Sequence, residues 1–407
     1  MSLAVSLDAV APAGRTNHKP QFTTDFDSAG VDVPALGADL RALRKELLAD
    51  VGPADLAHGQ RLARWGRACT ALGYATAWIA PNPVSALLLA LGNFARWTLV
   101  THPISHRAYD RIPGAPKAWT SRGYAKGWRR FIDWLDWITP EAWHEEHDLV
   151  HHFHLSEPTD PDQVEINLRW LRESKLPMPL RYAIVAGFAG IWKPVYYAPS
   201  TLKELRAAID RRRGGSGEPA DLLTWRTWTP LTPEGRELWG QCYLPYAGVK
   251  FLVLPALFAP LGAVAAWSVL INSLIAEVLT NVISFLMIVP NHTGEDLPRF
   301  DDPVKDNAEF FYRQIIASVN YKTGTPLINF LHGYLNYHIE HHLFPDLPLR
   351  QYELAQSRLK DICAKHGVPY REESVFKRAR MAIDVMIGKT SLQSTDIALP
   401  KAQIPHG

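Results

Sequence analysis

The stretch that decides the fold runs from Asn336 to Pro348 and reads Asn-Tyr-His-Ile-Glu-His-His-Leu-Phe-Pro-Asp-Leu-Pro. Its histidines His338, His341 and His342 are spaced i, i+3, i+4, which places them on one face of a helix. Neutral imidazole is a common ligand of first-row metal ions, and a bound ion satisfies nitrogen lone pairs that crowded rings would otherwise leave unpaired. The two prolines that follow end the helix. The stretch therefore predicts a metal site at the end of a short helix.

A second dense group of histidines lies upstream, in Trp-His-Glu-Glu-His-Asp-Leu-Val-His-His-Phe-His at residues 143–154. His147 and His151 are about one helical turn apart, and His152 is adjacent. Carboxylates beside metal ligands commonly accept hydrogen bonds from the ligand imidazoles and orient them. The carboxylates available here are Glu145, Glu146 and Asp148. We therefore expect this cluster to bind metal too.

Two shorter signals accompany these clusters. His102 and His106 form the sequence His-Pro-Ile-Ser-His, and their i, i+4 spacing allows them to share one helix face. Asn291 and His292 stand together directly after a long apolar stretch. Neither signal is specific by itself.

Apolar stretches at residues 62–80 and 84–100 are each close to the roughly 20 residues that a membrane-spanning helix needs. The turn Pro81-Asn82-Pro83 between them carries no positive charge, whereas arginines lie near both outer ends. The positive-inside rule therefore predicts a spanning hairpin with its turn outside the cell and both ends in the cytosol. A buried hairpin of a soluble protein is the alternative.

A longer apolar stretch covers residues 251–290, which is roughly 60 Å as a helix and hence two crossings of a core about 30 Å thick. We expect its turn near residues 267–272. Residues 181–200 are a weaker apolar stretch that Lys193 and two prolines interrupt, so we expect them to lie in the membrane interface.

The number of crossings tests whether the histidines lie on one side of the membrane. His102 and His292 each follow an apolar run, and two crossings between them return the chain to the same side. The predicted fold is an all-α membrane protein with four transmembrane helices in two hairpins and a cytosolic, histidine-rich helical cap. Both termini are then cytosolic.

Three regions follow along the chain. We expect residues 1–60 to consist of a leader without a signal peptide and an amphipathic helix at residues 33–51. Residues 61–370 form the membrane domain, and residues 371–407 a C-terminal tail. Within the domain, residues 127–138 mix charges with aromatic side chains, which is typical of an interfacial helix or of a core helix in the cap. The apolar stripe of the amphipathic helix consists of Leu36, Leu40, Leu43, Leu47 and Leu48.

Composition excludes several classes of protein. The 407 residues carry a formal net charge of +2 and no long basic run, which argues against a nucleic-acid surface. The three cysteines are far apart, which argues against a disulfide scaffold or an iron–sulfur motif and for a reducing compartment. Fourteen tryptophans suit membrane interfaces. The mean hydropathy of −0.12 implies a large polar part beside any membrane part.

Together the motifs resemble those of the integral-membrane fatty acid desaturase superfamily. The resemblance rests on HPISH at residues 102–106, HDLVHH at 147–152, NH at 291–292 and HIEHH at 338–342, and it extends over residues 62–370. It implies two iron ions held by histidines, with no catalytic residue beyond the metal ligands. The nine implied ligands are His102, His106, His147, His151, His152, His292, His338, His341 and His342.

The resemblance also implies the reaction. Ferrous iron with nitrogen ligands reduces dioxygen, the co-substrate, to an oxidant that takes hydrogen from an unactivated methylene. The substrate is a fatty acyl chain linked to CoA, a carrier protein or a lipid. No haem, ferredoxin or dinucleotide motif is present, so the electrons come from a separate protein such as a ferredoxin or cytochrome b5.

Two features depart from the family pattern. The second histidine motif is HxxxHH rather than HxxHH, which resembles alkane monooxygenases of the same superfamily, and the extra residue is expected to turn one imidazole by about 100° around a helix. Ile288 stands where some members have an asparagine ligand, and Asn291 or His144 are candidates to replace it.

Three hypotheses stay open: an acyl desaturase, which we favour, a hydroxylase of an aliphatic chain, and a non-catalytic membrane metal-binding protein.

Overall fold

The computed structural model describes residues 30–219 and 224–395, and it is mostly helical, as the sequence predicts. The described strands form two small parallel pairs. β1 (Pro298–Phe300) pairs with β4 (Gln393–Thr395), and β2 (Asn320–Tyr321) pairs with β3 (Glu372–Glu373). Residues 1–29 of the predicted N-terminal region and the last residues of the predicted tail lie outside the described residues.

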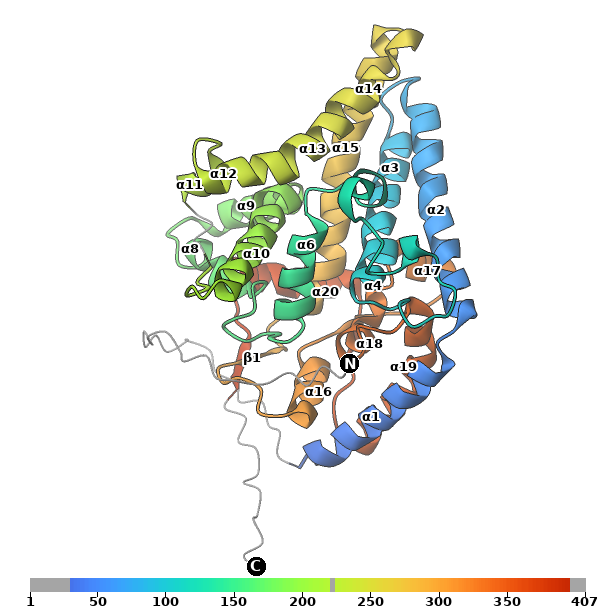
Figure 1. Cartoon of the computed structure of the whole chain (residues 1–407). Coiled ribbons are helices and arrows are strands. Elements are labelled where there is room, and N and C mark those ends of the chain that lie inside the picture. The colour runs from blue at the N-terminus through green and yellow to red at the C-terminus, as the bar shows by residue number, and fades with distance from the viewer. Residues whose placement is uncertain (1–29, 220–223, 396–407) are drawn as a thin grey trace, which may run out of the picture.

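Three long helices stand side by side and rise from the rest of the protein (Figure 1). They are α2 (Pro53–Ala77), α3 (Pro83–Ala95) and α15 (Ala263–Ile288). The turn between α2 and α3 is held by Asn272 of α15, whose amide nitrogen donates to the carbonyls of Ala77 and Ala80, each at 2.9 Å. The first predicted hairpin is therefore present and packs against α15.

By length and composition, three helices of the described residues are apolar enough to cross a membrane: Pro83–Ser105, Trp225–Leu261 and Ala263–Asn291. The helix α2 is not among them. Arg61, Arg64 and Arg67 make the part of α2 nearer its N-terminus too polar for such a span. The structure thus has three candidate spans.

The turn between the last two candidate spans lies at Gly262 and not at residues 267–272 as predicted. Gly262 has a φ of +114°, a conformation that favours glycine, and it follows the 3₁₀ turn η8 (Ala259–Leu261), which contains a proline. Residues 267–272 lie inside α15. The Asn272 side chain is satisfied there by the carbonyls of Ala77 and Ala80, so this polar residue does not mark a turn. The preceding helical region also begins much earlier than residue 251, at Trp225.

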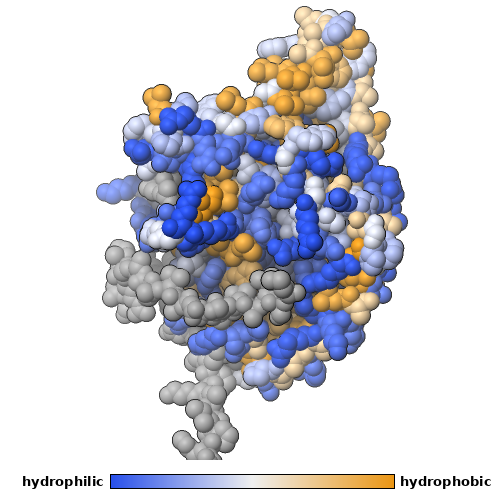
Figure 2. All heavy atoms as spheres, viewed as in Figure 1, coloured by the Kyte–Doolittle hydropathy of each residue, from blue (hydrophilic) through white to orange (hydrophobic). Residues whose placement is uncertain are grey.

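Apolar side chains gather on the far end of this hairpin, which is orange at the top of Figure 2. Leu257, Leu261, Val264 and Trp267 are all more than half exposed there. Exposed apolar surface of this kind marks contact with a membrane or a partner.

The bounds of the remaining elements are as follows, and those that lie outside the three candidate spans form the cap. The α-helices are α1 (Val33–Asp50), α4 (His102–Ser105), α5 (Arg130–Asp133), α6 (Pro140–Trp143), α7 (Val164–Asn167), α8 (Arg169–Arg172), α9 (Met178–Ala189), α10 (Ala198–Arg212), α11 (Trp225–Trp228), α12 (Pro233–Leu238), α13 (Leu244–Gly248), α14 (Leu254–Ala256), α16 (Asn307–Ile316), α17 (Pro326–Leu331), α18 (His338–Leu343), α19 (Leu349–Lys365) and α20 (Val375–Met386). The π-helical segments are η1 (Arg96–Thr101), η4 (His144–His151), η5 (Lys193–Tyr197), η6 (Trp239–Tyr243) and η7 (Val249–Val253). The other 3₁₀ turns are η2 (Lys117–Trp119), η3 (Gly127–Arg129), η9 (Val289–Asn291) and η10 (Leu335–Tyr337).

The amphipathic helix predicted at residues 33–51 is α1, which packs against α16 and α19. Of its predicted stripe, Leu36, Leu40, Leu43 and Leu47 are buried, and Leu48 is half-buried. The Asp32 side chain accepts a hydrogen bond from the Ala35 amide and caps the helix.

The weak apolar stretch at residues 181–200 does not form one long helix. It contributes to α9, whose 12 residues are roughly 18 Å long, and then to η5 and the first turn of α10. A helix of this length does not cross a hydrocarbon core about 30 Å thick.

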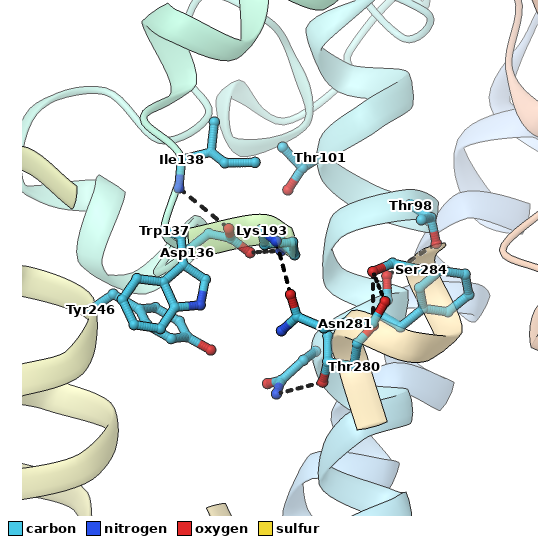
Figure 3. Close-up of polar contacts among 12 residues, drawn as sticks. Thr98, Thr101, Asp136, Trp137, Ile138, Lys193, Tyr246, Thr280, Asn281 and Ser284 are labelled. Atoms are coloured by element: carbon cyan, nitrogen blue, oxygen red, sulfur yellow. Dashed lines mark hydrogen bonds and ion pairs between the residues drawn. The ribbon is translucent and has the colours of Figure 1, made fainter. Parts of the chain in front are cut away.

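A buried polar network ties α15 to the cap (Figure 3). Lys193, almost fully buried, lies 2.7 Å from a carboxylate oxygen of Asp136, and its backbone amide donates to the Asn281 side chain at 2.9 Å. Nearby, Trp137 and Tyr246 donate to the two carboxylate oxygens of Glu277 at 2.7 and 2.5 Å. Buried polar groups are stable only when paired, so these contacts fix how α15 sits against the cap.

Candidate metal centre

The structure brings the nine predicted ligand histidines close together, and eight of them form two groups. In each group the ring nitrogens that face one another lie within 4.8 Å. The first group is His102, His106, His147, His152 and His341, and the second is His151, His292 and His342. The ninth histidine, His338, joins the second group, because its Nε2 lies 2.5 Å from Nε2 of His292.

Four separate parts of the chain deliver these side chains. His102 begins α4 and His106 follows it, directly after the π-helical end of the α3 region. The second motif lies on η4, the isolated histidine follows η9, and the third motif forms α18. His102 and His292 therefore lie on the same side of the protein, as the crossing argument requires.

The HxxxHH motif lies on a π-helix, so the 100° per residue of an α-helix, on which the expected rotation rests, does not apply to it. Residues 144–151 form a π-helix, in which hydrogen bonds close from i to i+5, and the His152 amide accordingly donates to the His147 carbonyl at 3.2 Å. The His147 and His151 rings stack with centroids 5.4 Å apart at 18°. The wider turn absorbs the extra residue, so both rings still reach the cluster.

The nitrogen positions fit a metal ion. Nε2 of His147 lies 2.9 Å from Nε2 of His102 and 3.3 Å from Nε2 of His152. A first-row ion with nitrogen ligands at about 2.1 Å sets neighbouring ligand atoms roughly 3.0 Å apart when they lie at right angles. Three imidazole nitrogens this close cannot satisfy one another by hydrogen bonds, because each neutral ring has only one N–H.

The third histidine motif, on α18, also fits metal binding. His341 Nδ1 lies 3.2 Å from the Tyr352 hydroxyl, and His342 Nδ1 lies 3.0 Å from the Gln314 side-chain oxygen. The Nε2 atoms of both rings are buried and have no hydrogen-bond partner among the described residues. Rings held by one nitrogen with the other left free are typical of metal ligands.

Other ring partners come from elements that the motifs do not include. His151 Nδ1 lies 2.9 Å from an Asp160 oxygen, and His292 Nδ1 lies 3.2 Å from the Ala317 carbonyl oxygen. Sequence reasoning missed Asp160, Ala317, Gln314 and Tyr352. Only Asp160, nine residues after His151, gave a signal, as an acidic residue close to a histidine motif.

Of the predicted carboxylate partners only Asp148 lies close to a clustered ring, 3.3 Å from Nε2 of His106, but its hydrogen bond is with the His144 ring. Glu145 instead pairs with Arg212. Glu146 is fully buried, and neither of its oxygens has a partner among the described residues. Neighbours in sequence point to different sides of η4, so only one of the three carboxylates contacts a clustered ring.

The environment keeps most of the cluster neutral. Burial, followed by the neighbouring imidazoles, holds the pKa of His147 and His152 well below the ordinary histidine value. Burial also acts to lower the pKa of His151, but the negative charge and hydrogen bond of Asp160 outweigh it and raise this pKa. Neutral imidazole is the form that binds metal.

The two candidate replacement ligands behave differently. The His144 ring bonds to Asp148, with Nδ1 at 2.6 Å from its oxygen, and belongs to neither group. Asn291 donates its amide to the Leu335 carbonyl at 3.0 Å, while its side-chain oxygen is buried without a partner among the described residues.

An apolar cavity of about 220 Å³ opens beside the histidines. His102, His147, His151, His292 and His338 form part of its wall. Its apolar lining comes from Trp97, Trp143, Leu168, Leu171, Ile184, Val185, Phe188, Trp192, Val195, Phe285, Ile288, Val289, Leu335 and Met386. Ile288, which the resemblance places where some members have an asparagine ligand, is thus a wall residue of this cavity.

The fold and site define a class of protein: a helical protein with apolar helices and a buried histidine cluster, fit to bind metal, that opens onto an apolar cavity. Comparison with known proteins gives the family. Residues 76–374 match the family described as Fatty acid desaturase, and the chain belongs to that family. It is accordingly an enzyme, an oxidoreductase that desaturates fatty acyl chains, and its apolar helices mark it as a membrane protein.

Three distant relatives each match most of the chain. The NADPH-dependent stearoyl-CoA 9-desaturase of Mycobacterium tuberculosis is 22% identical over 392 residues, which is 91% of this chain and 81% of that protein. The chloroplastic acyl-lipid (7-3)-desaturase of Chlamydomonas reinhardtii is 24% identical, over 89% of this chain and 64% of its own length. The Delta(5) fatty acid desaturase A of Dictyostelium discoideum is 23% identical, over 74% and 61%.

Proposed function

We propose that this desaturase works with two iron ions, which the nine clustered histidines hold. His102, His106, His147, His152 and His341 bind one ion, and His151, His292, His338 and His342 bind the other. The observation that carries the proposal is the convergence of these rings from four parts of the chain, with five of the nine at the wall of one apolar cavity. First-row ions take at most about six ligands, so nine exceed what a single ion can use.

When bound, the iron supplies the chemistry of dioxygen, whose reduction provides the oxidant for removing hydrogen from a methylene group. The protein itself positions the acyl chain. Trp143 stacks on His147 with ring centroids 4.3 Å apart, and both line the cavity, so this wall holds an acyl chain against the rings. Because the lining is largely apolar, it binds a hydrocarbon chain and excludes water from the reacting methylenes.

The names of the relatives support a proposal for the acyl carrier and the electron donor. The names of two relatives specify a stearoyl-CoA and an acyl-lipid substrate, which supports CoA or a lipid as the carrier beside the carrier protein that the sequence also leaves open. The name of one relative specifies NADPH dependence. We propose that a separate electron-transfer protein, such as a ferredoxin or cytochrome b5, delivers the two electrons.

For the membrane arrangement we propose four spans in two hairpins, with α2 as the fourth. The arginines of α2 lie toward its cap end, whereas the turn at residues 80–82 carries no charge. The positive-inside rule then places the cap and both termini in the cytosol.

Product mass tests the reaction. The chain is expressed in a host whose acyl chains are profiled with and without the gene, and we expect acyl chains lighter by two hydrogens. His341→Ala should abolish this product. His144→Ala is the matched control and should retain it, because its ring lies outside both groups. A gain of one oxygen without unsaturation would instead identify a hydroxylase.

A further inference from the structure

A second cavity, of about 540 Å³, lies where α2 and α3 meet the loop at residues 116–133. It shares no lining residue with the cavity beside the histidines. Its walls are formed by Ala63, Gly66, Arg67, Thr70, Gly92, Ala95, Arg96, Val100, Pro116, Ala118, Trp119, Tyr124, Arg129, Ile132 and Asp133. The site therefore lies on the membrane hairpin, at its cap end.

The charge of this cavity is positive. Three arginines face one carboxylate, Asp133, and only Arg129 is paired with it, at 2.9 Å. Among the described residues, no carboxylate lies within ion-pair distance of Arg67 or Arg96. Two guanidinium groups that line one cavity without a counter-ion are well suited to bind an anion, because their planar forks match phosphate oxygens.

The segment that contributes Arg129, Ile132 and Asp133 to the cavity also carries exposed apolar side chains. Residues 127–138, predicted as one interfacial or core helix, instead form the short η3 and α5, after which Trp134 and Trp137 turn into the core. Trp128, Phe131 and Ile132 are 68%, 52% and 61% exposed. Apolar side chains next to basic ones are typical of a segment that enters the interface of a membrane.

From these observations we propose that the cavity binds an anionic phospholipid of the leaflet on the cap side. The phosphate lies between Arg67 and Arg96, and the walls of Ala63, Gly66, Val100 and Trp119 enclose the rest of the head group. The exposed apolar side chains of η3 and α5, next to the cavity, enter the same leaflet. Neither arginine belongs to the candidate metal centre, so this site is separate from the acyl site.

Binding of phosphatidylglycerol to the purified full-length chain, measured by native mass spectrometry from detergent micelles, tests this proposal. A juxtamembrane arginine contributes about fivefold to the affinity for anionic lipid, so Arg67→Gln with Arg96→Gln should weaken binding roughly 30-fold. The control is Arg64→Gln, an exposed arginine of the same helix that does not line the cavity, which should bind like the wild type. Diacylglycerol, which lacks the phosphate, should not bind.

Three results would overturn the proposal. Equal binding by the double variant and the wild type would show that the arginines do not bind the lipid. An equal loss in Arg64→Gln would show attraction by general charge. Displacement of the lipid by millimolar inorganic pyrophosphate would assign the site to a soluble phosphate ligand. If the double variant does not elute as a folded species, the two single variants, each expected to lose about fivefold, provide the same comparison.

Discussion

Gln314 of α16 is a sharp test of the metal centre, because it contacts the cluster without belonging to any histidine motif. Its side-chain oxygen lies 3.0 Å from Nδ1 of His342, and its amide donates to the His152 carbonyl at 3.1 Å. It is 2% exposed, so water cannot replace it. Gln314→Leu removes both contacts and leaves a buried N–H of the His342 ring unpaired.

The expected effect can be worked out from these contacts. A buried group that loses its partner costs about 1–3 kcal/mol, and loss of a hydrogen bond that orients a metal ligand typically lowers metal affinity 10- to 100-fold. The two figures agree, since tenfold in affinity corresponds to about 1.4 kcal/mol. We therefore expect Gln314→Leu to bind iron 10- to 100-fold more weakly while remaining folded.

Iron content is measured by elemental analysis while a chelator of known affinity is titrated against the purified protein. Gln314→Glu, which keeps an acceptor for the His342 ring at similar volume, is the matched control and should retain most of the affinity. Unchanged iron affinity in Gln314→Leu, with His342 still required, would refute the argument that Gln314 orients this ligand. An equal loss in both variants would assign the effect to the contact with the His152 carbonyl.

Three further predictions concern metal content, ligands and topology. Gently extracted protein should contain about two irons per chain, and a single zinc or no metal would contradict the two-iron proposal. Alanine at His338, His341 or His342 should abolish turnover without preventing membrane insertion, because the apolar hairpins do not depend on these rings; activity retained in two of the three variants would count against their role as ligands. After replacement of the native cysteines, a cysteine at Ala80 should react with an impermeant maleimide from outside the cell and one at Ser216 only after permeabilisation, whereas the reverse labelling would invert the topology.

Much of the site could be predicted because metal ligation imposes strict requirements on residue type and spacing. Histidines one turn apart share a helix face whatever the rest of the chain does, so three motifs and one isolated histidine indicated the cluster before the fold was known. Spacing could not reveal Gln314 or Tyr352, because their contacts join residues 28 and 11 positions apart and depend on how α16 and α19 pack against α18.

The sequence by itself determined the local features of this protein: the histidine motifs, the buried face of α1 and the apolar helices, because each depends on residues close together in the chain. The tertiary structure decided the rest. It placed the hairpin turn at Gly262, made η4 a π-helix that brings His151 into the cluster, and left Glu146 without a partner. These outcomes depend on packing between distant segments. A helix can change its winding or its end point at a small local cost in free energy, which long-range contacts offset.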